Sequence, residues 1–308
     1  MTAFLDLLAS ATLPIFVVSA IGFWMGRTRR MGPRQVKGVN TYAMVVAVPA
    51  LMFTLLGEAD LGAYDWSVLV VYLAAEIAIY ALTFLICRYL LGIETAEALL
   101  LGMTAIFVNG VFFVLPIAGI LYGPGAEQVV VGIIVLDSLV LFGCTMLLLD
   151  ILTAQGASVG RVLGRFASNP MIIGMALGMA VTVTGVAVPQ GVDTYARFVG
   201  ASAAPAALFA LGVTLGRVEL GKLGAPLPVV VIMKMAGQPL MALALIGALA
   251  APGPWADTAL LMTVGPAGAM PFVLALGYGV RSDRIAMAVI VTTVVSLVTL
   301  PAVSLLAR

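Results

Sequence analysis

Residues 102–123 read GMTAIFVNGVFFVLPIAGILYG, and residues 260–279 read LLMTVGPAGAMPFVLALGYG. Each stretch is long and apolar enough to cross a hydrocarbon core, which takes about 20 residues. Residues that break helices stand near the centre of both stretches: Asn109, Gly110 and then Pro116 in the first, and Gly265, Pro266, Gly268 and Pro271 in the second. A membrane helix that is broken leaves backbone groups free to bind an ion or a substrate. The two stretches therefore predict two interrupted membrane helices that form a binding site.

The composition extends this prediction to the whole chain. Of 308 residues, 63% are apolar and 9% are charged, against about 45–50% and about 25% in soluble domains. The net charge of +1 gives no attraction to nucleic acid. The sequence predicts an all-α polytopic membrane protein whose ten apolar runs are transmembrane helices at 7–26, 38–57, 66–90, 96–122, 128–152, 169–188, 197–216, 227–250, 257–279 and 284–306.

Basic residues predict the orientation of these helices, because short cytoplasmic loops collect Lys and Arg. Twelve basic residues fall in the loops of one side, and two, Arg197 and Arg308, fall on the other. The twelve are Arg27, Arg29, Arg30, Arg34, Lys37, Arg88, Arg161, Arg165, Arg217, Lys222, Arg281 and Arg284. We therefore expect a multi-pass protein of the cell membrane with both termini on the non-cytoplasmic side.

An internal repeat emerges when the sequence is laid on itself with a shift of 156 residues. The segment AVPALMFTL at 47–55 then meets AAPAALFAL at 203–211, and Tyr122-Gly123 meets Tyr278-Gly279. Two repeats, 1–152 and 153–308, contain five spans each, so the second repeat enters the membrane from the opposite side. Inverted repeats with broken helices at matching places are typical of secondary transporters.

Ionisable residues inside apolar runs cost about 2.5–3.5 kcal/mol each on insertion scales and so need an explanation. Glu76, Asp137 and Lys234 lie near the middle of their predicted spans, and Gln238 lies one helical turn after Lys234. One interpretation is a structural ion pair between Lys234 and a carboxylate. The other gives Lys234 and Gln238 to an anionic substrate, and Glu76 or Asp137 to a coupling proton or cation. Asp150, near a helix end, is expected to be solvated.

The residues also resemble the auxin efflux carrier family of secondary transporters, which includes bacterial carriers of malonate-like acids. The resemblance covers nearly the whole chain. Its most specific parts are VPALMF at 48–53, NPMIIGMALG at 169–178, APAALFALGVTLG at 204–216, and the final FVLALGYGVRSDRIAMAVIVTTVVSLVTLP at 272–301. The order and spacing of these motifs together make the resemblance strong.

The resemblance implies a fold of two inverted five-helix repeats. Helices 1, 2, 6 and 7 would form a scaffold, and helices 3–5 and 8–10 a moving transport unit in which broken helices 4 and 9 cross. The crossing would map onto residues 109–116 and 266–271. Two features depart from the family: bulky residues 111–115 follow Asn109-Gly110, and Met270 stands where a polar residue is common. Both make the crossing less polar and leave open a more apolar substrate.

The sequence thus predicts a carrier that moves a small organic anion, a mono- or dicarboxylate, by elevator-like alternating access. Coupling to H⁺ or Na⁺, or no coupling, stays open. A relative of the bile-acid-type sodium symporters and a passive channel are the alternatives. An enzyme is not expected, because the chain has no histidine and no Gly-x-Ser-x-Gly motif.

No metal site, cofactor or disulfide is expected either, since Cys87 and Cys144 stand alone in apolar runs. The oligomeric state stays open. Small residues such as Gly174, Gly178 and Ala180 suit close packing against lipid or against a second protomer in a homodimer.

Overall fold

The computed structural model describes residues 13–153, 160, 163–164, 167–217 and 224–306. The regular secondary structure of these residues is helical throughout. The β-type pairing among them is a single isolated bridge. The start of the first predicted span and four of the basic residues used for the orientation, Arg161, Arg165, Lys222 and Arg308, lie outside the described residues.

The chain divides into two compact units, each built from two separate parts of the sequence. The small unit comprises Ile15–Tyr64 and Ser158–Arg217, and the large unit comprises Asp65–Ala157 and Val218–Arg308 together with Met1–Pro14. The described helices of the small unit are α2 (Leu13–Arg27), α3 (Pro33–Tyr42), η2 (Ala43–Ala47), α4 (Val48–Gly57), η3 (Leu61–Ala63), α11 (Pro170–Thr184), α12 (Gln190–Gly200) and α13 (Ala203–Arg217).

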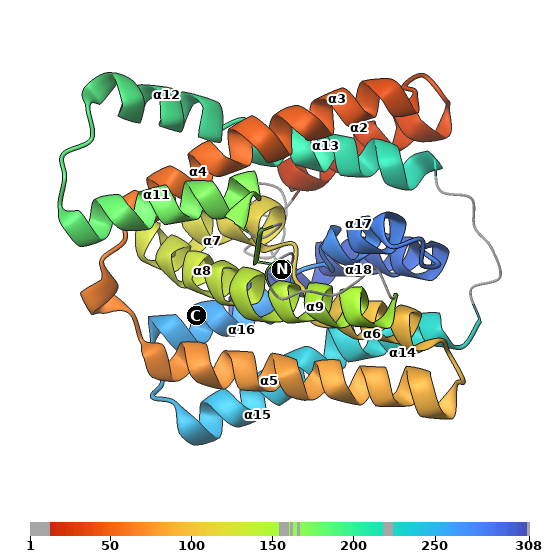
Figure 1. Ribbon diagram of the computed structural model, residues 1–308. Helices are drawn as coiled ribbons and strands as arrows, with labels where there is room; N and C mark the ends of the chain where they lie inside the picture. The colour runs from red at the N-terminus through yellow and green to blue at the C-terminus, as the bar shows by residue number, and fades with distance from the viewer. Residues whose placement is uncertain (1–12, 154–159, 161–162, 165–166, 218–223, 307–308) are drawn as a thin grey trace. The chain divides into compact units, whose positions relative to one another are not determined.

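The large unit contains the longer series of helices, coloured from orange to yellow-green and from cyan to blue in Figure 1. In its first part these are α5 (Trp66–Leu85), η4 (Ile86–Leu90), α6 (Thr95–Thr104), η5 (Gly110–Val114), α7 (Leu115–Tyr122), α8 (Pro124–Leu136), η6 (Asp137–Phe142) and α9 (Gly143–Leu152). In its second part they are α14 (Pro226–Ile232), η7 (Met233–Gly237), α15 (Gln238–Leu249), α16 (Pro254–Thr263), α17 (Met270–Gly277) and α18 (Asp283–Leu306). Helices α5 and α15 lie side by side, as do α7 and α8 (Figure 1).

Six helices in the described part of the chain are long and apolar enough to cross a membrane. They are Pro33–Gly57, Trp66–Leu90, Gly125–Leu152, Gln190–Arg217, Pro226–Leu249 and Asp283–Ala302, and three shorter apolar helices accompany them at Leu13–Arg27, Gly110–Tyr122 and Pro170–Thr184. All nine overlap spans that the sequence predicts. The helices explain the composition, because apolar side chains are needed both between helices and towards lipid.

Glycines bring helix backbones into contact within the small unit. A Cβ added at Gly22 or Gly26 of α2 would lie 2.3 or 2.2 Å from a backbone carbonyl oxygen of α13. Gly212 and Gly216 of α13 approach the backbone of α2 as closely, with distances of 2.2 and 2.3 Å. Such small residues at four-residue spacing allow the close helix crossings that are common in membrane proteins.

The same kind of contact identifies the partner of two glycines that the sequence left open. Gly174 and Gly178 are both buried against α4 of the same unit. A Cβ at Gly174 would lie 2.4 Å from the Pro49 carbonyl oxygen, and one at Gly178 would lie 2.6 Å from that of Phe53. The sequence spacing correctly indicated a close helix contact, while the partner is another helix of this chain.

Candidate functional site

The helix that begins with α6 is interrupted where the sequence places Asn109 and Gly110. Helix α6 ends at Thr104, and the π-helical turn η5 begins at Gly110 and continues into α7. Asn109, just before η5, has φ −74° and ψ 60°, which lies outside the helical region. Residues 105–109 therefore connect two separate helices inside one apolar stretch.

The second interruption lies between α16 and α17. Pro266 has no N–H and disfavours helical backbone at Gly265, so the α16 helix stops before them, at Thr263. Pro271 is the second residue of α17, where an N–H has no partner within a helix in any case. The second half-helix therefore begins at Met270, at the end of the cluster of helix-breaking residues in this stretch.

The two interruptions are joined by backbone hydrogen bonds. The contacts are an antiparallel bridge between Val108 and Ala267, a bond of 2.9 Å from the Asn109 N–H to the Pro266 carbonyl, and one of 2.7 Å from the Gly268 N–H to the Phe107 carbonyl. These bonds satisfy backbone groups that would otherwise be unpaired in an apolar interior. The two breaks consequently form one structure, although about 160 residues of sequence separate them.

Glycine is needed at the meeting point because the neighbouring side chains come very close. A Cβ at Gly110 would lie 2.3 Å from Cε of Met262, and one at Gly265 would lie 2.5 Å from Cγ2 of Val114. Distances below 3.0 Å require that something shift. A larger residue at either position would require the Met262 or Val114 side chain to move.

The Asn109 side chain is a polar group of this junction that the protein leaves available. Its residue is only 6% exposed, it does not cap η5, and it forms no hydrogen bond within the described residues. Such an amide can donate to, or accept from, a bound ligand. Helix η5 begins directly after Asn109, and the first N–H groups of a helix carry a partial positive charge.

A cluster of buried charges lies in the same unit. Glu76 of α5, Lys234 of η7 and Gln238 of α15 are completely buried, and Asp137 of η6 is 3% exposed. Asp137 and Lys234 both lie in π-helical turns, which are rare and often mark functional sites. Within the described ranges, no group of three or more His, Cys, Asp or Glu side chains could hold a metal ion.

Hydrogen bonds connect this cluster to both interrupted helices. The Lys234 ammonium donates to Oε1 of Gln238 at 2.6 Å and to the carbonyl of Thr263, the last residue of α16, at 2.8 Å. Gln238 in turn donates from Nε2 to Oε1 of Glu76 at 3.1 Å and to the carbonyl of Ile106, just after α6, at 3.0 Å. Of the four buried groups, Lys234 and Gln238 thus contact the backbone at the breaks.

A direct ion pair between Lys234 and a carboxylate, one of the two interpretations of the sequence, is absent from the described residues, since Gln238 stands between Lys234 and Glu76. Lys234 still interacts electrostatically with Glu76 and Asp137. Two carboxylates and one ammonium leave the cluster with one more acidic than basic group. An uncompensated charge is expensive in an apolar interior, so such a cluster is suited to taking up a cation.

Two polar contacts at the site were not predicted from the sequence. Thr292 of α18, which is buried, accepts a hydrogen bond of 3.1 Å from the N–H of Ala267 at the second break. Asp150 was expected to be solvated, but it is 2% exposed and accepts a hydrogen bond of 2.7 Å from the Tyr278 hydroxyl. The signal for Thr292 was its place among hydroxyl residues in an apolar run, with Thr293 and Ser296 beside it, and the motif search did not weigh them.

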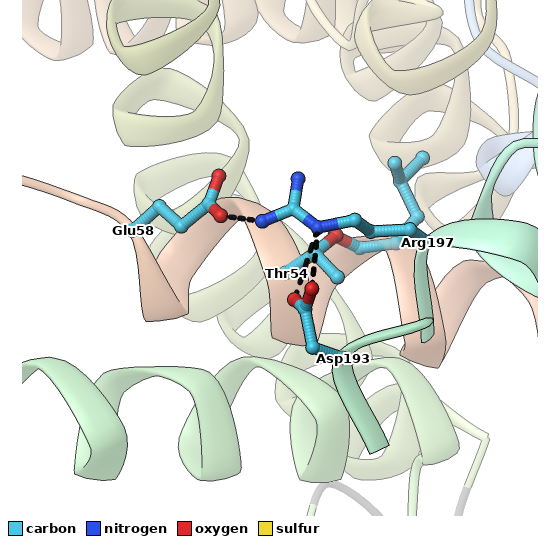
Figure 2. Close-up of polar contacts among 5 residues, drawn as sticks. Thr54, Glu58, Asp193 and Arg197 are labelled. Carbon is cyan, nitrogen blue, oxygen red and sulfur yellow. Dashed lines mark hydrogen bonds and ion pairs between the residues drawn. The ribbon is translucent and has the colours of Figure 1, made fainter. Parts of the chain in front are cut away.

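The small unit contains a separate pocket of about 390 Å³. Figure 2 shows its polar side, where the Arg197 guanidinium lies between the carboxylates of Asp193 and Glu58. The Arg197 Nε lies 2.9 and 3.0 Å from the two Asp193 oxygens. The guanidinium is therefore already paired with two acidic groups. The pocket is lined by Phe53, Thr54, Gly57, Glu58, Val181, Val186, Val188, Gln190, Asp193 and Arg197.

The apolar helices, the joined breaks and the buried polar cluster together define a multi-pass membrane protein of the transporter class. Comparison with known proteins agrees: a family model described as "Membrane transport protein" matches residues 7–159 and 157–304. The chain belongs to this family of membrane transport proteins, which confirms the resemblance to the auxin efflux carriers.

Two relatives match along almost their entire length. The chain is 26% identical over 307 residues to a protein of Rhizobium meliloti named "Putative malonate transporter", with 96% of this chain and 94% of the relative covered. It is 24% identical over 292 residues to an "Uncharacterized transporter" of Methanothermobacter thermautotrophicus, with 94% and 95% covered. Both relatives are named as transporters, in agreement with the prediction that the chain is not an enzyme.

Proposed function

We propose that this chain is a secondary active transporter that moves a small organic anion, a mono- or dicarboxylate, across the cell membrane. The observation that carries the proposal is the buried Asn109 side chain, which has no hydrogen-bond partner in the described part of the chain. It directly precedes the helix that begins with η5, and helix N-termini attract anions. The substrate-binding residues would be Asn109, Gly110, Pro116, Gly265, Pro266, Gly268 and Pro271.

A carboxylate substrate is supported by two further observations. The buried Lys234 places a basic group in the unit that contains the breaks, and one relative is named as a malonate transporter. The apolar residues 111–115 and Met270 favour a small substrate whose carbon chain is apolar. We include Lys234 and Gln238 in the proposed substrate site as residues that act through the ends of the broken helices, because their hydrogen bonds go there.

We propose that transport follows an elevator-like alternation of two five-helix inverted repeats, 1–152 and 153–308. The large unit would be the transport unit, and the small unit would be the scaffold. The division of the chain into these two units supports the assignment. The assignment is also supported by the contents of the large unit, which contains both helix breaks and the buried residues Glu76, Asp137 and Lys234. Ten membrane crossings, with crossed helices 4 and 9, are part of this proposal.

The orientation and the coupling ion are also proposals. The basic residues support termini on the non-cytoplasmic side. Glu76 and Asp137 are the proposed binding groups for a coupling H⁺ or Na⁺, because they leave the buried cluster with an excess of acidic groups. A homodimer is compatible with this scheme and is not required by it.

Exchange of labelled malonate tests the proposal. The purified protein is placed in liposomes that are preloaded with unlabelled malonate, and uptake of labelled malonate is followed. Asn109→Ala should reduce exchange about tenfold or more, as expected when a buried hydrogen bond to a charged substrate is lost. Asn40→Ala removes an exposed amide of α3 and serves as the matched control.

The proposal fails if no mono- or dicarboxylate is exchanged, or if a folded Asn109→Ala variant transports as well as the unchanged protein. A conductance far above carrier turnover would instead favour a channel. Thermal stability measured with each carboxylate gives an independent readout of binding, because a ligand that binds the folded state stabilises it.

A further inference from the structure

Two side chains hold the C-terminal ends of both interrupted helices. Lys234 donates to the Thr263 carbonyl at the end of α16, and Gln238 donates to the Ile106 carbonyl after α6. The two donors are linked to each other by the 2.6 Å bond from Lys234 to Gln238. All four residues are buried. One positive charge and one amide thus serve two helix ends that lie 157 residues apart in the sequence.

The end of a helix attracts positive charge. Its last carbonyl groups have no partner within the helix, and the helix dipole makes this end negative. In broken transporter helices, unwound carbonyls and half-helix C-terminal ends commonly coordinate a cation. In this chain, N–H groups of Lys234 and Gln238 already bind the carbonyl oxygens that such a cation would use.

We propose that Lys234, together with Gln238, is a built-in cation that takes the place of a bound metal ion at the two helix ends, so that transport by this chain does not require Na⁺. This inference rests on the proposed function and narrows the coupling ion left open there. Lys234 and Gln238 are positioning residues: they fix the two breaks, while Asn109 and the helix starts contact the substrate.

The surroundings of Lys234 support this assignment. The acidic groups that interact with it are Glu76 of α5 and Asp137 of η6, and Tyr72 of α5 interacts with both of them. A Na⁺ ion at the carbonyl oxygens of Thr263 and Ile106 would have to displace the N–H groups of Lys234 and Gln238 that bind them. A coupling proton differs from Na⁺ in this respect. It would bind to a carboxylate and would not need the carbonyl oxygens of the helix ends.

The first experiment uses the unchanged protein. Malonate exchange is measured in liposomes at constant pH and ionic strength, with Na⁺ replaced completely by K⁺ or by choline. The exchange rate should change less than about twofold, since no step needs Na⁺. A loss of about tenfold or more in both replacements would overturn the proposal, because it would require a Na⁺ site.

The second experiment removes the ammonium and supplies it again. Lys234→Ala should lose about tenfold or more of the exchange rate, and propylammonium or butylammonium added to the buffer should restore part of it by filling the vacated space. Tetramethylammonium has no N–H donor and should not restore it. Lys234→Met is the matched control, because it fills the space without a charge and leaves no room for the amine. A folded Lys234→Ala variant that exchanges malonate as fast as the unchanged protein, with no cation added, would contradict the proposal.

Thermal unfolding separates a failure of this inference from a failure of the proposed function. The melting temperature of the purified protein is measured in NaCl and in choline chloride without any carboxylate. Equal melting temperatures are expected, whatever the substrate is. Stabilisation by Na⁺ alone would refute the built-in cation even if no carboxylate were transported, because an ion that binds the folded state raises its stability.

Discussion

The two units of this protein use opposite means to hold their helices together. In the described residues, the buried polar and charged side chains all belong to the large unit, among them Glu76, Asp137, Lys234 and Gln238. The small unit instead brings backbones together at glycines, such as Gly26 against Val213 and Gly174 against Pro49. Polar groups permit binding of ions and substrates, whereas backbone contacts through glycine give close packing and no chemistry.

Glycines reinforce the contrast, because they face different atoms in the two units. In the small unit, Gly22, Gly212 and Gly216 lie against backbone carbonyls. In the large unit, Gly110 lies against the Met262 side chain. Side chains can shift between rotamers more easily than a helix backbone can move. The large unit can therefore adjust its side-chain packing around a binding site more easily than the small unit can move its helices apart.

The largest expected effect is the loss of the polar network in the large unit. Gln238→Met removes the donors to Glu76 and Ile106 and the acceptor for Lys234, which leaves buried groups unpaired. We expect the free energy of unfolding in mixed micelles to fall by about 3–5 kcal/mol. Gln190→Met, at an exposed glutamine of α12, is the control and should change it little. Equal effects of the two changes would show that the network does not stabilise this unit.

The second effect tests the backbone contacts of the small unit. Gly26→Ala places a Cβ 2.2 Å from the Val213 carbonyl oxygen, so α2 and α13 must separate. We expect the free energy of unfolding to decrease by about 1–3 kcal/mol. Gly247→Ala has open space around it and should be neutral or stabilise α15 by up to about 1 kcal/mol. If the Gly26→Ala variant were as stable as the Gly247→Ala variant, α2 and α13 would not cross as closely as described.

A smaller effect is expected at the second break. Thr292→Val removes the hydroxyl that accepts the Ala267 N–H, and this should cost about 1–2 kcal/mol and weaken substrate binding. Thr293→Val is the matched control, because its hydroxyl bonds only to the Val289 carbonyl in its own helix. Unfolding and carboxylate-dependent melting shifts are measured for both. If Thr293→Val weakened binding more than Thr292→Val, the hydrogen bond from Ala267 to Thr292 would not be what stabilises the second break.

The smallest effect concerns the start of α5, at the surface of the large unit. Asp65 caps this helix by accepting from the N–H groups of Ser67 and Val68. The hydrogen bond from the Ser67 hydroxyl lowers the pKa of Asp65. Stability from this carboxylate is therefore present above its ordinary pKa and is lost as the pH falls through the lowered value. Asp65→Ala should cost about 1 kcal/mol or less.

Asp65→Asn is the informative companion to that change. Asparagine caps helices about as well as aspartate, so this variant should keep most of the stability and lose its pH dependence. Thermal unfolding between acidic and neutral pH compares the two variants. A pH dependence that is unchanged in Asp65→Asn would assign the titration to another group.

Much of the site could be predicted from the sequence because breaks in apolar helices require unusual residues. Asn109-Gly110 and Gly265-Pro266 marked both interruptions within a few residues, and the midplane charges were visible as exceptions in apolar runs. The second interruption falls between Thr263 and Met270, within the cluster of helix-breaking residues that ends at Pro271. Asp150 was misjudged because its position near a helix end did not reveal the Tyr278 hydroxyl.

The sequence by itself determined that this is a membrane protein of the transport family, where its helices break and which ionisable groups it must bury, because each of these leaves a local mark in an apolar chain. Only the tertiary structure decided which groups meet: Gln238 with Glu76 and Ile106, Lys234 with Thr263, and Ala267 with Thr292. Helices that are apolar on all sides carry no periodic polar face, so their sequences do not reveal which side packs against which neighbour.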